Sequence, residues 1–150
     1  MKFTPRHINR FLLIKLPSAW ISGIRLQSIS DKKAVVTAKH RWINQNPFQS
    51  MYFAVLAMGA ELSIGILVMK KIQESGKNIS MLVTGIQGEF YKKARGKIRF
   101  VCEQGDLIDT QIHQAVQTGE GIRFELVSKA FDEQNDEVCQ FVFQWSIKLK

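Results

Sequence analysis

Residues 51–69 read MYFAVLAMGAELSIGILVM, and Glu61 is the only charged side chain in this run. The run is apolar nearly all round a helix, which predicts a helix buried at the centre of the fold. An ionised carboxylate placed there is destabilised by several kcal/mol unless it has partners or a chemical task. Burial favours the protonated form of a carboxyl group, which suits a general base or a group that activates water. A structural Glu61, satisfied by donors at a subunit interface, is the alternative, and the sequence leaves the two interpretations equally open.

The length and composition predict one domain over residues 1–150, with 45% apolar residues as in an ordinary soluble protein. The central run is at the lower edge of the length that spans a membrane. It contains Glu61 and the small residues Gly59, Ala60 and Gly65, so a buried helix surrounded by strands is the preferred interpretation. No secretory signal is visible at the start of the sequence, and we therefore expect a cytoplasmic protein.

The remaining segments alternate in the manner of strands. Strands are expected over residues 24–30, 34–41, 79–91 (with a bulge), 97–103, 122–131 and 138–149, and helices over about 7–16 and 52–74. Residues 106–118 keep helical spacing, although a strand is possible for part of them. The order predicts an α+β fold in which an antiparallel sheet wraps around one long central helix. Pairing two such sheets across a dimer would cover that helix.

Cysteine and histidine positions predict no metal site. Cys102 and Cys139 lie far apart in strand patterns, so we expect buried free thiols. The three histidines are scattered, and neither a metal nor a cofactor is expected.

The formal net charge is +8, with basic clusters at residues 32–33, 70–71 and 92–99. Such a surface favours anionic partners: nucleic acid, membrane headgroups or a phosphate-bearing molecule such as coenzyme A. A solvated face that only aids solubility is the alternative for any one cluster. A nucleic-acid binder ranks last, because no recognition motif is visible and the aromatic side chains alternate inward.

Three features together resemble the hotdog thioesterase superfamily. Asn46, in the loop before the central helix, precedes Glu61 by about four turns. Residues 90–96 read FYKKARG, an aromatic and basic strand end with a following glycine, and the last strand is long and aromatic. The likeness covers about residues 20–150. It is greatest to the acyl-CoA thioesterase branch related to the phenylacetate-pathway and 4-hydroxybenzoyl-CoA enzymes, and within it to uncharacterised thioesterase-like proteins.

The resemblance implies an acyl-CoA or acyl-carrier-protein thioesterase that works as a homodimer or homotetramer. Glu61 would act as general base on water or attack the thioester carbonyl, and Asn46 would orient the water or the carbonyl. The backbone N–H groups of Phe53 and Ala54 would stabilise the oxyanion.

Other residues would bind the two ends of the substrate. Candidates for the coenzyme A phosphates are Lys92, Lys93 and Arg95. Candidates for an acyl channel are Phe48, Met51, Met58, Leu62 and Met81, although plain core is the commoner role for such residues.

The sequence departs from the family at the start of the helix. Tyr52-Phe53-Ala54 replaces the usual glycines, and Lys93 replaces a frequent proline. The bulk of Phe53 therefore leaves open a second function, a non-catalytic acyl-binding hotdog protein in which Glu61 is structural. Ser50 is expected to cap the helix, and Ser63 has no adjacent histidine that would make it a nucleophile.

Overall fold

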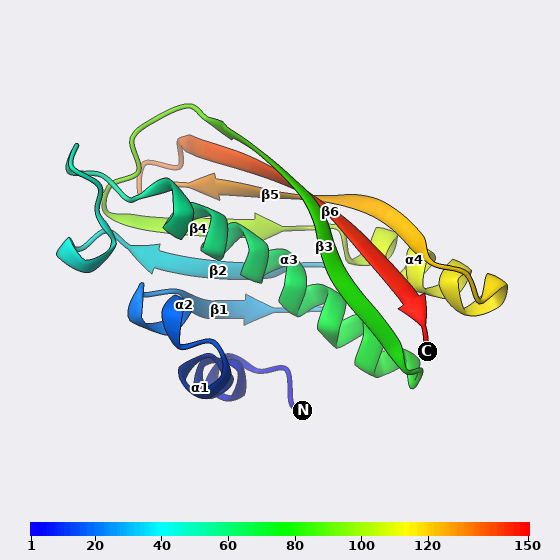
Figure 1. Ribbon diagram of the computed structural model, residues 1–150. Helices are drawn as coiled ribbons and strands as arrows, with labels where there is room; N and C mark the ends of the chain where they lie inside the picture. Colours follow the sequence, from blue (N-terminus) through cyan, green and yellow to red (C-terminus); the bar gives the residue numbers. More distant parts are fainter.

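A long helix, α3 (Phe53–Ser75), lies across a six-stranded antiparallel sheet in the computed structural model, which describes all residues, 1–150 (Figure 1). The strands follow the spatial order β1-β2-β4-β5-β6-β3. Their bounds are β1 (Arg25–Ile29), β2 (Ala34–Lys39), β3 (Ile79–Phe90), β4 (Lys97–Cys102), β5 (Ile122–Phe131) and β6 (Glu137–Leu149). The predicted α+β architecture, a sheet wrapped around one central helix, is confirmed.

The helix packs closely on the sheet because its small residues permit it. A Cβ on Gly59 would lie 2.4 Å from a ring carbon of Phe100 on β4, so only glycine fits at this contact. α3 ends where Gly76 takes a left-handed conformation, with φ of 66°. Most of the helix is buried in the core that it forms with the inner face of the sheet.

The strand predictions are confirmed by the alternation of buried side chains. On β6, Cys139, Phe141, Phe143, Trp145 and Ile147 are all buried on the inner face. β3 contains the predicted irregularity, a shift in its pairing with β6 between residues 83 and 85.

Helices flank the sheet at two places. α1 (Pro5–Lys15) and α2 (Pro17–Ile21) lie beside β1, and α4 (Gly105–Thr118) lies at the other end of the molecule (Figure 1). Pro17 ends the first helix as expected, but it also begins α2, which the sequence did not predict, because proline fits the first turn of a helix. Residues 106–118, for which the sequence left a strand possible in part, are helical because they lie in α4.

The start of α3 differs from expectation at Ser50. Tyr52 is the N-cap residue, and no side chain caps the helix. The Ser50 hydroxyl bonds to the Asn46 side chain, so the prediction that Ser50 caps the helix was wrong.

One edge of the sheet is open. β3 pairs only with β6, and its inner face extends beyond the cover of α3. Ile86 and Phe90, opposite the inward-facing Phe143 and Cys139, are 57% and 50% exposed. α3 is long and apolar enough to cross a membrane by length and composition alone, but 61% of its apolar window is buried, as in a core helix.

Candidate active site

Glu61 lies in the third turn of α3 and is partly buried. Burial raises the pKa of its carboxyl group, and no other cause contributes to the shift. No protein donor bonds to the carboxylate. It therefore lacks the hydrogen-bond partners that a purely structural buried glutamate would need.

Gly65, one turn further along the helix, gives this carboxylate its space. A Cβ on Gly65 would lie 2.9 Å from Glu61 Oε1 and 3.4 Å from the outer ring carbon Cη2 of Trp145. The missing side chain thus leaves room that the carboxylate and the indole ring share.

A small cavity of about 280 Å³ opens beside Glu61. One wall is a stripe of α3 at helical spacing: Ala54, Ala57, Met58 and Glu61. The opposite walls are the start of α2 and the inner face of β6, through Leu16, Ser18, Ala19 and Phe143. Glu61 is the only ionisable group in an otherwise mostly apolar cavity.

The start of α3 supplies free backbone donors. The first intrahelical hydrogen bond runs from Val55 N to Tyr52 O at 2.9 Å, so the N–H groups of Phe53 and Ala54 have no acceptor within the protein. The positive end of the helix dipole lies at the same place. The Phe53 ring, 56% exposed, packs edge-on against Tyr52 with ring centres 4.9 Å apart.

A second, larger cavity of about 510 Å³ adjoins the start of α3 and gathers many of the predicted site residues. It lies between the loop before α3 and the segment after β3. Among its lining residues are Asn46, Phe48, Met51, Phe53, Lys92 and Lys93. Most of the predicted residues are therefore divided between two cavities on different faces of the first turns of α3.

Asn46 organises the loop that leads into α3. Its Oδ1 accepts from Phe48 N at 2.9 Å and from Ser50 N at 3.3 Å, while its Nδ2 donates to Ser50 Oγ at 3.0 Å. Both ends of the amide are thus engaged within residues 46–50, and Asn46 does not line the Glu61 cavity.

The three basic candidates have different surroundings. Lys92 Nζ donates to Asp132 at 2.6 Å and to Asp136 at 2.8 Å, and these bonds raise its pKa. Lys93 Nζ lies 5.9 Å from the centre of the Phe48 ring, and Arg95 Nε donates to the backbone oxygen of Gln49. Only Lys93 and Arg95 are without a carboxylate partner.

The acyl-channel candidates also separate. Met58 lines the Glu61 cavity, whereas Phe48 and Met51 line the larger one. Leu62 is buried in the core, Met81 packs against that core, and neither lines the Glu61 cavity or the larger one. The sequence did not single out Leu16, Ser18 and Ala19. No local pattern shows where the α1–α2 turn docks.

The other polar side chains considered in the sequence analysis, one serine and two cysteines, have structural roles only. Ser63 is buried and bonds to Ala60 O at 2.8 Å and to Ser128 Oγ at 2.7 Å. Cys102 and Cys139 are buried free thiols, as predicted, and burial raises their pKa values to about 11 and about 12. No group of three or more metal-ligating side chains occurs.

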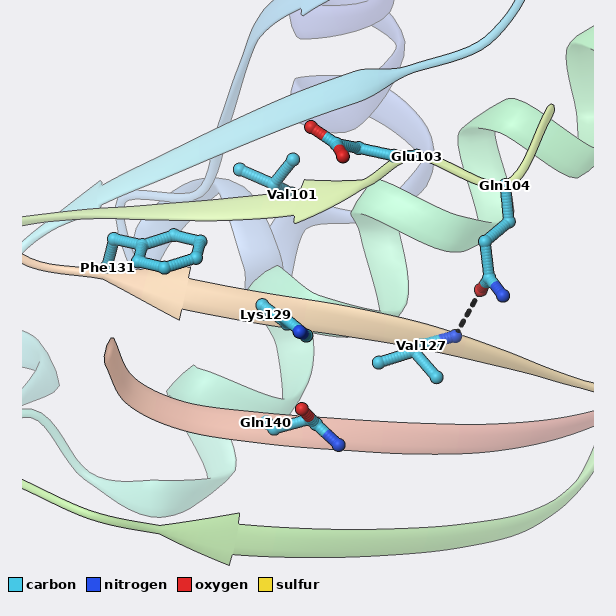
Figure 2. Close-up of a pocket in the computed structure, with 7 residues that line it drawn as sticks. All are labelled: Val101, Glu103, Gln104, Val127, Lys129, Phe131 and Gln140. Carbon is cyan, nitrogen blue, oxygen red and sulfur yellow. Dashed lines mark hydrogen bonds between the residues drawn. The ribbon is translucent and has the colours of Figure 1, made fainter. Parts of the chain in front are cut away.

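A further hollow, of about 420 Å³, lies on the outer face of the sheet (Figure 2). Here β4 and β5 separate after Val101, and Gln104 Oε1 accepts a 2.6 Å hydrogen bond from the Val127 N–H group. The hollow contains none of the predicted site residues.

The fold and site define a hotdog protein whose central helix carries a carboxylate in an apolar cavity. The chain belongs to the family described as a domain of unknown function, DUF4442, which matches residues 4–147. No curated protein matches the chain by sequence.

Several solved structures are similar in fold. A Pseudomonas aeruginosa protein of unknown function, described as a probable thioesterase, has a TM-score of 0.83 at 21% identity, over 98% of this chain and 97% of that chain. A Chlorobaculum tepidum protein with unknown function has a TM-score of 0.81 at 19% identity, over 98% of each chain. A mutant of a Staphylococcus aureus thioesterase enzyme has a TM-score of 0.64 at 11% identity, over 83% of this chain and 93% of that chain. At these identities the likeness establishes the fold.

Proposed function

We propose that this protein hydrolyses an acyl thioester, with Glu61 as the general base. The observation that carries the proposal is a single cavity lined both by Glu61, a carboxylate without a protein donor, and by Ala54 at the free start of the helix. The two lie seven positions apart along the helix, which corresponds to about 10 Å. This distance leaves room for a thioester carbonyl and a water molecule between them.

In the proposed reaction, Glu61 takes a proton from water as the oxygen attacks the thioester carbonyl carbon. The N–H groups of Phe53 and Ala54 stabilise the oxyanion that forms. Collapse of the tetrahedral intermediate breaks the C–S bond, and protonated Glu61 returns its proton to the thiolate. A carboxyl group with a raised pKa suits both proton transfers better than an exposed one.

Similar structures support this choice of residues. Mutants of the Staphylococcus aureus protein with alanine in place of a glutamine, and in place of a glutamate fifteen positions later, have been crystallised. Asn46 and Glu61 have the same spacing in this chain. We assign to Asn46 the role of holding the loop that delivers the backbone donors of α3.

The proposed substrate is an acyl group carried by coenzyme A or a carrier protein. Met58 and the Glu61 cavity would take the acyl group near the reacting carbon. Phe48 and Met51 would contact the pantetheine arm or a longer chain in the larger cavity, and Lys93 and Arg95 would bind phosphate. Lys92 contributes less, because two aspartates already neutralise it.

A non-catalytic acyl-binding protein is the second candidate. Phe53 favours it, because a bulky side chain at the first helical position narrows access to the backbone donors. In this function Glu61 would lie beside the bound acyl group without reacting.

Release of free thiol from short, medium, long and aromatic acyl-CoAs tests the proposal. We expect turnover in the natural chain and a loss of about a hundredfold or more in Glu61→Gln, with the oligomer intact. Tight binding of acyl-CoA without turnover would select the acyl-binding function instead. Met81→Leu, on β3 and outside both cavities, is the matched control and should keep its activity.

A further inference from the structure

Two arginine side chains lie against the same turn, residues 20–24, which joins α2 to β1. Arg25 Nη1 donates to the backbone oxygens of Trp20 and Ile24, both at 2.8 Å, and the guanidinium carbon lies 3.4 Å from the Trp20 ring centre. Arg41 Nη2 lies 3.6 Å from the position of a Cβ on Gly23. The two cationic groups therefore share one small area of surface.

A buried amide fixes this arrangement. Asn44, 2% exposed, donates from Nδ2 to Ser22 O at 3.0 Å and to Lys39 O at 2.9 Å. Its Oδ1 accepts from Arg41 N at 2.8 Å. These bonds tie the short 3-10 helix η1 (Trp42–Asn44) to the turn that carries Arg25, so the closeness of the arginines is built into the fold.

No carboxylate neutralises the pair. Every ion pair in the protein is made by a lysine. The pKa of Arg25 is lowered first by burial and then by the charge of Arg41. Two like charges held together in this way are stabilised by an anion that contacts both.

The charge of the whole chain is concentrated in the same part. Residues 1–60 contain nine Lys or Arg and a single acidic residue, Asp31, which pairs with Lys70. Residues 61–150 contain twelve basic and twelve acidic residues. The net charge of +8 therefore comes entirely from the part that forms α1, α2, β1, β2 and η1.

We propose that Arg25 and Arg41 form a binding site for a phosphate group, carried by a free phosphate-bearing ligand or by a lipid headgroup. Arginine suits this role because its planar fork can bind two phosphate oxygens at once. The backbone and Trp20 hold Arg25 in place, and its Nε and Nη2 make no hydrogen bond within the protein. Trp42, 83% exposed, follows Arg41 directly and offers an aromatic contact beside the site. The site is separate from the Glu61 cavity and does not depend on thioester hydrolysis.

Titration of the full chain with inorganic pyrophosphate, coenzyme A and phosphatidylglycerol vesicles tests the proposal. Arg41→Gln removes one of the two charges without disturbing the fold, because Asn44 holds Arg41 through the backbone. Arg123→Gln removes the same charge at the start of β5, eight residues from Phe131, which lies in the sheet row of Arg25, and is the matched control. We expect Arg41→Gln to weaken binding by about tenfold or more and Arg123→Gln by less than about twofold.

The three probes identify the source of the phosphate. Binding of pyrophosphate or coenzyme A that Arg41→Gln alone weakens indicates a free ligand, and the same pattern with vesicles only indicates a lipid headgroup. Equal weakening by both variants, or no binding to any probe, overturns the proposal. Acyl-CoA turnover is measured on the same proteins. If the protein shows no turnover but still binds a probe through Arg41, the proposed hydrolysis is overturned while the phosphate site is supported.

Discussion

Burial raises the pKa of the Glu61 carboxyl group, so the folded protein favours its protonated form. Unfolding returns the group to a pKa near the ordinary value of 4.5. Between that value and the raised pKa, the folded state binds more protons than the unfolded state. The free energy of unfolding therefore falls as the pH rises through this window.

Glu61→Gln removes the free-energy cost of burying an ionised carboxylate without changing the size of the side chain. We expect its Tm to exceed that of the natural chain by about 2–4 °C at a pH of about 7, and the two to converge at a pH of about 4. Thermal unfolding followed by circular dichroism at both pH values measures the difference. A lower Tm for the variant at neutral pH would mean that an interaction stabilises the charged carboxylate.

Gly65 and Gly59 form a matched pair on the same helix. Gly65→Ala places a Cβ 2.9 Å from the flexible end of Glu61, so the carboxylate has to move. We expect kcat to fall by about tenfold while stability is kept or rises by about 0.5–1 kcal/mol, because alanine favours a helix. Gly59→Ala meets the rigid Phe100 ring at 2.4 Å and should lower stability by about 1–3 kcal/mol.

Activity assays and thermal melts on both variants separate the two roles. Equal loss of stability in Gly65→Ala and Gly59→Ala would show that Gly65 serves packing alone.

At the scale of structural elements, the segment that joins β3 to β4 contains two lysines with different roles, one in stability and one in binding. Lys92 ties this link to the β5–β6 turn through Asp132, which is 4% exposed and whose pKa the Lys92 bond lowers. We expect Lys92→Gln to lower the Tm by a few degrees, because it leaves a buried carboxylate without its cation. We expect Lys93→Gln to keep the Tm and raise the KM for acyl-CoA by a fewfold.

Melting curves and steady-state kinetics on the two variants check this division. The Asp132 contribution is present above its unfolded pKa and fades as the pH falls through the lower folded value. The Tm difference for Lys92→Gln should therefore shrink in acid. A difference that does not change with pH would rule out the ion pair as its cause.

The elements that the sequence predicted are those with a strong local pattern. The all-apolar run of α3 and the alternation of β6 identify both elements from residue type alone. α2 begins at a proline that also reads as a helix stop, and α4 has too few apolar positions to exclude a strand. Tertiary packing decides both.

Local pattern also explains which site residues were found. Asn46 and Phe53 lie near the start of α3, and Lys93 lies in the FYKKARG motif at the end of β3; all three line one cavity. Leu62 was expected to line a pocket, but it lies about 100° round the helix from Glu61 and enters the core. The wall opposite Glu61 comes from residues 16–19, whose docking depends on the whole fold.

At the scale of the whole molecule, we predict from the open edge at β3 that a second copy of the chain covers it. Ile86 and Phe90 face inward yet are exposed, as expected for side chains that a partner's apolar surface would bury. We expect Ile86→Lys to shift the protein from dimer to monomer in light scattering, and acyl-CoA turnover to fall with it. Leu82→Lys, whose side chain faces the outer surface of the same strand, is the control and should remain dimeric.

Whether the dimers pair further into tetramers can be measured in the same experiment. A natural chain that is monomeric at all concentrations would contradict this prediction.

The pairing of β3 with β6 has a consequence for synthesis on the ribosome. β3 has no other neighbour, and its first residue, Ile79, pairs with Leu149, the last residue of β6. At the usual elongation rate, β3 emerges several seconds before its partner strand exists. During that interval β1, β2 and β4 can already pair with one another and pack on α3, while the apolar side chains of β3 remain exposed. The nascent chain is therefore most vulnerable to aggregation and to chaperone capture just before β6 is synthesised.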